Sequence, residues 1–135
     1  MYKAQQVSLM RWSLQAERIA KGHISSQDLG WKPLSAKTIM IKSDKGLSEN
    51  ILVATSSYFR SITGWVDGDT AYVGVKKGVR EENGTEIEKV ALVLEFGSDE
   101  RNIPERPLWR PTMAEVSVWT YKNNNPVNIF YELIR

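Results

Sequence analysis

Cysteine is absent from the 135-residue chain, and histidine occurs once, as His23. Without cysteine the chain cannot form disulfides, ligate zinc through thiolates or use a thiol nucleophile. No nucleophile elbow lies near His23, and the polar stretch around it indicates a surface residue rather than a catalyst or ligand. The sequence also has no glycine-rich phosphate loop and no paired-histidine metal motif. We therefore predict that the protein is not an enzyme and needs no cofactor or metal.

Long apolar runs and a strong charge of one sign are also missing. No apolar run approaches the 18 residues of a membrane span, and the first twelve residues lack the apolar core of a signal peptide. The net charge of +2 is too small to indicate nucleic-acid binding from charge alone. Glu81 and Glu82 lie in a charged loop, with no apolar pocket to shift a carboxylate pKa for acid–base catalysis. A hydrolase that uses two carboxylates distant in the sequence stays an open alternative. We expect one domain over residues 1–135, with no membrane contact.

The N-terminal part of the chain carries a helical pattern. Apolar residues recur at helical spacing over residues 3–21, which predicts a helix whose core-facing side carries Val7, Met10 and Leu14, with Ala4 and Ile19 as further candidates. Gly22 is a suitable residue to follow the end of this helix.

The clearest β signal is a hairpin. Residues 61–66 and 70–75 are rich in β-branched and aromatic residues, and Asp67-Gly68-Asp69 between them predicts a tight turn. The charged residues 76–86 that follow predict an exposed loop, which includes Lys76, Lys77 and Arg80.

The remaining segments have weaker patterns. Residues 36–42, after Ser35, predict a short helix, and residues 111–121 predict a helix with Pro111 in its first turn. Residues 87–96 resemble a buried helix, with a strand possible. Residues 52–62 and 126–134 each fit either a helix or a strand.

The segment from residue 90 to 112 combines an apolar stretch with a proline-rich one. Pro104, Pro107 and Pro111 fall within eight residues, fix three φ angles and remove three backbone donors. Each proline also disfavours the α region for the residue before it, so the segment is predicted to be stiff and extended. Arg106 and Arg110 lie on this segment and can pair with a carboxylate in the same subunit or in a neighbouring one.

Glu95 follows four apolar residues and is therefore expected to be partly buried and to need a partner, for which Arg106 is our first choice. The five tryptophans divide into two groups. Trp12, Trp65 and Trp119 are expected in the core, whereas Trp31 and Trp109 lie beside prolines and are expected at an interface.

Three blocks of sequence stand out, in order: Trp31-Lys32-Pro33-Leu34, residues 52–62 with Val66 to Gly74, and Glu95-Phe96-Gly97 with Ile103 to Pro111. Taken together, they resemble the phage virion-morphogenesis proteins that complete tails or join heads to tails. The first block is similar to the family pattern W-x-P-L-S-x-x-T-I, and the second to L-x-x-T-G-x-L-x-x-S-I followed by a hairpin. The third is similar to E-F-G, a short loop and I-P-A-R-P-F-L-R-P. The blocks span residues 31–111 and include Trp31, Pro33 and Leu34; 52–62 with Val66 to Gly74; and Glu95, Phe96, Gly97, Ile103, Pro104, Arg106, Pro107, Leu108, Trp109, Arg110 and Pro111.

The chain departs from the family pattern at several positions. Ser56 stands where the family commonly has glycine, and Glu105 stands where it has alanine. Leu108-Trp109 replaces Phe-Leu, and residues after Asn123 match nothing in the pattern.

The resemblance implies an α+β fold in which a small, mostly antiparallel sheet with a β-hairpin packs against two or three helices. It also implies a structural protein of the virion, assembled in the host cytoplasm as a homo-oligomeric ring at the head–tail junction. Such a ring completes or terminates the tail and contacts the tail-tube and head-connector proteins, and DNA passes through its lumen without sequence-specific binding.

A second interpretation is a small basic nucleic-acid-binding module. It would use Lys76, Lys77, Arg80 and Arg101 together with aromatic side chains. The acidic residues interspersed in the 76–86 loop count against a dedicated DNA-binding surface.

Overall fold

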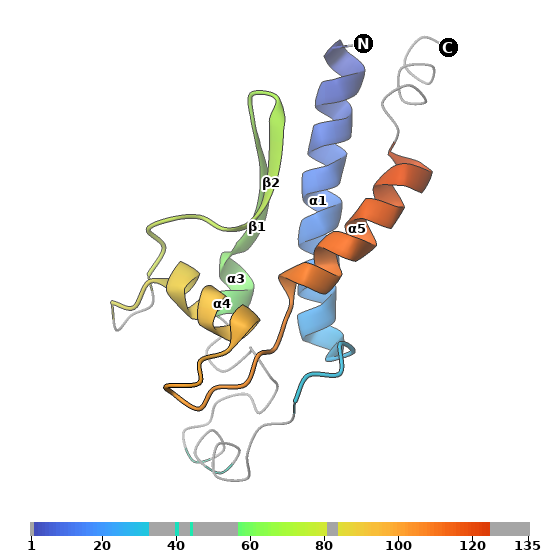
Figure 1. The fold of residues 1–135 in the computed structure, drawn as a ribbon. Coiled ribbons are helices and arrows are strands. Elements are labelled where there is room, and N and C mark those ends of the chain that lie inside the picture. Colours follow the sequence, from blue (N-terminus) through green and yellow to red (C-terminus); the bar gives the residue numbers. More distant parts are fainter. Residues whose placement is uncertain (1, 33–39, 41–43, 45–56, 81–83, 125–135) are drawn as a thin grey trace.

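The computed structural model describes residues 2–32, 40, 44, 57–80 and 84–124. The described elements are α1 (Tyr2–Ser26), α3 (Ser57–Ser61), β1 (Ile62–Asp67), β2 (Thr70–Val75), α4 (Ile87–Phe96) and α5 (Trp109–Asn123). They form the predicted α+β fold, with an antiparallel hairpin packed against helices (Figure 1). The predictions for residues 36–42 and 126–134 lie outside the described residues, apart from Met40.

Strands β1 and β2 form the predicted hairpin, paired from Ile62–Val75 to Asp67–Thr70. Gly68 begins the two-residue turn with a φ of 63°, a conformation that favours glycine. Of the segment 52–62, which fitted a helix or a strand, residues 57–61 form the helix α3 and Ile62 is the first residue of β1. Residues 52–56 lie outside the described residues.

Helix α1 packs its small residues, rather than its large apolar ones, against the hairpin. Ala16 and Ser13 are buried, and a Cβ added at Gly64 of β1 would lie 2.1 Å from the Ser13 carbonyl oxygen. The Gly64 amide also donates to Glu17 at 2.8 Å. Strand and helix backbones therefore approach too closely for a large side chain between them.

This packing overturns the expected orientation of α1. Met10 and Leu14, which were predicted to be buried, are 60% and 53% exposed. The buried positions are the small residues and one isoleucine: Ala4, Ser8, Ser13, Ala16, Ala20 and Ile24. Gly22 lies inside the helix instead of following it, because α1 continues to Ser26.

Helix α5 crosses α1 and contacts it at two polar points (Figure 1). Ser8 and Asn124 exchange two hydrogen bonds, from Ser8 Oγ to the Asn124 carbonyl at 3.2 Å and from Asn124 Nδ2 to the Ser8 carbonyl at 2.7 Å. His23 lies between Asp28 and Glu115, with 2.6 Å from Nδ1 to Asp28 and 2.6 Å from Nε2 to Glu115. His23 therefore bridges the two helices and is not the isolated surface residue that we predicted.

Helix α4 confirms the helical interpretation of residues 87–96, and α5 begins two residues earlier than predicted. In α5, Val116 is buried, whereas Met113 and Tyr121 are exposed.

The core lies where α1, α3, the hairpin, α4 and the start of α5 meet. It contains Ala20, Ile24, Trp31, Tyr58, Ile62, Ile87, Ala91 and Leu108. Trp31 is 8% exposed, so its expected position at an interface is wrong for this chain. Trp12, Trp65 and Trp119, which were expected in the core, are only half-buried. In the part of the chain that the structure describes, no helix has both the length and the hydropathy to cross a membrane.

Candidate functional site: the Glu95 clamp

Helix α4 ends at a glycine that the structure requires. Gly97 has a φ of 74°, and a Cβ there would lie 2.8 Å from the Glu105 nitrogen and 2.9 Å from the Ile103 oxygen. Residues 98–103 then form a tight loop, because Ser98 and Ile103 exchange two backbone hydrogen bonds of 2.8 Å. The chain reverses and returns along the end of α4, where the Arg106 amide donates to the Leu94 carbonyl at 2.7 Å.

The Glu95 carboxylate binds the first turn of α5. Its Oε1 accepts from the backbone amides of Leu108 at 2.7 Å and Trp109 at 2.8 Å, and its Oε2 accepts from the amide of Arg110 at 3.1 Å. The first amides of a helix have no partner inside the helix and carry partial positive charge, so a carboxylate there is doubly favoured.

Pro111 completes this arrangement. It has no amide proton, and the next amide, that of Thr112, already donates to the Leu108 carbonyl at 3.1 Å. Every backbone donor at the start of α5 is therefore either paired or absent. The residue that precedes the helix, Leu108, supplies no side-chain cap, and Glu95 of α4 takes that role.

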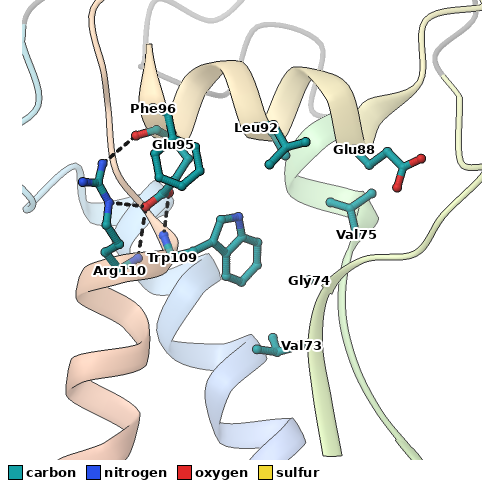
Figure 2. A pocket seen from close by; sticks show the side chains of 10 residues that line it. Val73, Gly74, Val75, Glu88, Leu92, Glu95, Phe96, Trp109 and Arg110 are labelled. Carbon is teal, nitrogen blue, oxygen red and sulfur yellow. Dashed lines mark hydrogen bonds and ion pairs between the residues drawn. The ribbon is translucent and has the colours of Figure 1, made fainter.

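Arg110 neutralises Glu95. Its Nε donates to Glu95 Oε2 at 3.0 Å, and its Nη2 donates to the Glu95 carbonyl oxygen at 2.7 Å (Figure 2). Nη2 also reaches Glu105 at 3.3 Å, and the guanidinium lies 5.2 Å from the centre of the Phe96 ring. We call Glu95, the amides of residues 108–110 and the Arg110 side chain the Glu95 clamp.

The carboxylate of the clamp is held in its charged form. Glu95 is 5% exposed, and burial alone would raise its pKa. The backbone hydrogen bonds from Trp109, Leu108 and Arg110, with that from the Arg110 side chain, outweigh burial and lower the pKa.

The expected pairing of Glu95 with Arg106 is wrong. Arg106 is 9% exposed, and its Nε donates to the Lys32 carbonyl at 2.9 Å. The stiff turn from residue 97 to 106 directs Arg106 away from Glu95 and brings Arg110, the second residue of α5, onto it.

Two tryptophans attach the proline-rich segment to the rest of the core. The Trp31 indole nitrogen donates to the Pro107 carbonyl at 2.6 Å, and that of Trp109 donates to the Tyr58 hydroxyl at 3.0 Å. Burial is the main reason that the pKa of Tyr58 is raised, so its hydroxyl stays protonated and can accept this bond.

Most predicted site residues are thus brought together inside one chain. Leu108 and Arg106 are buried, and Ile103, Pro104, Pro107, Trp109 and Pro111 are half-buried. Phe96, Glu105 and Arg110 are exposed. Pro33 and Leu34 lie outside the described residues.

The charged loop residues lie elsewhere. Arg80 pairs with Glu86 at 2.8 Å and also donates to the Gly84 carbonyl. Lys76 lies 5.0 Å from the centre of the Trp65 ring, which stacks on Tyr72, and Lys77 is exposed. Sequence reasoning missed this aromatic pair, although the two residues are direct cross-strand neighbours in the predicted hairpin.

A cavity of about 430 Å³ opens beside the clamp, between α4 and β2 (Figure 2). Its lining is mostly apolar, with Val73, Val75, Leu92, Phe96 and Trp109, and Glu88 at one side. Among the described residues, no group of three or more histidine, cysteine, aspartate or glutamate side chains is arranged to hold a metal ion. Comparison of the chain with protein-family models, with curated proteins and with solved structures found no match.

Proposed function

We propose that this protein is a structural subunit of a phage virion that forms a ring, completes or terminates the tail and joins it to the head connector. The proposal rests on the three sequence blocks, and it assigns the chain a role in assembly rather than in catalysis. The DNA would pass through the lumen of the ring without base-specific contacts.

The observation that carries the proposal is the convergence of the three blocks. Trp31 of the first block binds Pro107 of the third, and Tyr58 of the second binds Trp109 of the third. Glu95 then ties the two halves of the third block together. Residues that are widely separated along the chain but belong to one pattern therefore share one packed unit, as expected if the pattern encodes a fold.

The surface of the chain also supports a role in assembly. Four large apolar side chains, Met10 and Leu14 of α1 and Leu92 and Phe96 of α4, are more than half exposed. Scattered apolar side chains are ordinary on a surface, but here each of these helices presents two large ones a single turn apart, which indicates a surface that a partner covers.

Native mass spectrometry and negative-stain imaging of the purified protein, alone and with tail-tube protein, test the proposal. We expect a discrete closed ring, either in solution or on the end of the tube, that persists when salt is added. A chain that stays monomeric with both tube and connector proteins would contradict the proposed function.

A nucleic-acid-binding module is the second candidate, and the Trp65–Tyr72 pair with Lys76 favours it. Stacked aromatic side chains beside a cation are suited to single-stranded nucleic acid. Arg80 adds little, because Glu86 neutralises it. Binding to DNA that weakens steeply with added salt, and that Trp65→Ala abolishes, would favour this candidate over the ring.

A further inference from the structure

Helix α1 carries an apolar surface that nothing in the described chain covers. Val7, Met10 and Leu14 follow one another at helical spacing and, with Val66 of β1, line a shallow depression of about 340 Å³. We call these four residues the α1 stripe. Such spacing is typical of a helix face that packs against another element, yet here α1 packs into its own fold through the opposite, small-residue face.

The α1 stripe has basic surroundings. Lys3 and Arg11 line the same depression, and Arg18 lies one helical turn beyond Leu14. The only acidic residue of α1, Glu17, is engaged by Lys21 and by the Gly64 amide.

A second apolar surface lies further along the hairpin, next to α4. The cavity between α4 and β2, which we call the α4 groove, is lined by Val73 and Val75 of β2 and by Leu92 and Phe96 of α4 (Figure 2). Leu92 and Phe96 are 60% and 62% exposed.

The α4 groove has an acidic edge. Glu88 precedes Leu92 by one helical turn and Phe96 by two, so the three share one face of α4. In the described part of the chain, Glu88 makes no ion pair, whereas Arg110 neutralises the nearby Glu95.

We propose that the α1 stripe of one copy of this chain docks in the α4 groove of the next copy. The inference rests on the proposed function and specifies the contact from which the ring is built. Each surface combines a depression with half-exposed side chains: Met10 and Leu14 enter the α4 groove, and Phe96 enters the depression of the α1 stripe. The basic surroundings of the α1 stripe then meet the acidic edge of the α4 groove.

A second copy is the occupant because the two surfaces complement each other and do not overlap. The α1 stripe uses α1 and Val66 of β1, whereas the α4 groove uses β2, α4 and the start of α5, so the two surfaces share no lining residue. A contact between two different surfaces of identical chains is heterologous, and it produces a ring when the rotation closes.

Three matched variants test this contact in the full chain: Leu14→Glu on the α1 stripe, Leu92→Glu in the α4 groove, and Tyr121→Glu on α5 as the control. All three side chains are more than half exposed, at 53%, 60% and 87%, so each variant is expected to fold. Under the conditions in which the parent forms rings, Leu14→Glu and Leu92→Glu should reduce the ring fraction by at least about tenfold. Tyr121→Glu should assemble like the parent.

An equimolar mixture of the two defective variants gives the decisive result. The intact groove of Leu14→Glu can accept the intact stripe of Leu92→Glu, but the dimer cannot extend because both remaining surfaces carry glutamate. Native mass spectrometry should therefore find a dimer with one copy of each variant. Three outcomes would overturn the inference while leaving the proposed function standing. They are rings formed by either single variant, no mixed dimer in the mixture, or a variant that keeps its rings but loses tube binding. Absence of rings from the parent, alone and on the tube, would instead contradict the proposed function.

Discussion

The sequences of the Glu95 clamp and the α1 stripe each suggest the role that the structure gives to the other region. The proline-rich segment has the stiffness and the arginines of a surface that presents side chains to a partner, yet its hydrogen-bonding groups bind Glu95, Trp31 and Lys32 of the same chain. The stripe has the periodicity of a core helix face, yet Met10 and Leu14 are more than half exposed. In this chain, the segment richest in motifs holds the fold together. The apolar helix face that the fold leaves exposed is where a partner is expected.

The largest expected effect in this comparison comes from Glu95→Ala. The change removes the acceptor of three backbone amides and of the Arg110 side chain from a site that is 5% exposed. We expect the free energy of unfolding to fall by more than about 3 kcal/mol, because several backbone donors, each worth about 1–3 kcal/mol when left unsatisfied, lose their acceptor at once. Urea denaturation followed by tryptophan fluorescence measures this loss.

Glu105→Ala is the matched control for the clamp. Glu105 is exposed and contacts the same arginine at 3.3 Å, so its loss should cost less than about 0.5 kcal/mol. Equal losses for both variants would show that the clamp does not hold α4 and α5 together.

Gly97→Ala tests the turn that directs the chain from α4 into the clamp. The added Cβ meets backbone atoms of residues 103–105 at 2.8–3.2 Å, and the φ of 74° is strained for alanine. We expect a loss of about 1–3 kcal/mol in the free energy of unfolding. Gly22→Ala is the control, since Gly22 lies inside α1 with nothing within 4 Å of an added Cβ, and it should gain about 0.5–1 kcal/mol. A stable Gly97→Ala protein would contradict the close approach at this turn.

The parts of the fold that local chemistry determines were predictable. The β-branched and aromatic residues on both sides of Asp67-Gly68-Asp69 predict the hairpin, and the apolar run that stops at Gly97 favours a helix over residues 87–96 while leaving a strand possible. The clamp was predictable only in part: Glu95 needs a partner, but the choice between Arg106 and Arg110 depends on how the 98–103 loop turns. The orientation of α1 was not predictable, because it follows from the contact of Gly64 with Ser13, 51 residues apart in the chain.

His23 gives a smaller effect that depends on pH. Burial lowers its pKa, but the hydrogen bonds and charges of Asp28 and Glu115 outweigh burial, and the net pKa is raised above 6.5. A raised pKa means that the folded protein binds the proton more tightly than the unfolded chain. The stabilisation should be fully present below about pH 6.5 and should be lost as the pH rises through the folded-state value, because only imidazolium can donate to both carboxylates.

Thermal unfolding between pH 6 and pH 9 measures this effect in the parent and in His23→Gln. We expect the melting temperature of the parent to fall with rising pH in this range relative to that of the variant. Parallel curves would show that His23 does not link α1 to α5 through its charge.

Leu14→Ala has the smallest expected effect on the isolated chain and tests the other half of the comparison. A leucine buried in a core loses about 2–5 kcal/mol on this change, which the helical pattern of α1 alone would predict. Because Leu14 is 53% exposed and alanine favours helices, we expect a change within about 0.5 kcal/mol for the monomer at low concentration. Ala16→Leu, on the buried face of the same helix, should instead cost about 1–3 kcal/mol, since Ala16 is fully buried and a larger side chain overpacks the contact. If Leu14→Ala proved the more destabilising of the two, α1 would present the opposite face to the hairpin and the α1 stripe would belong to the core.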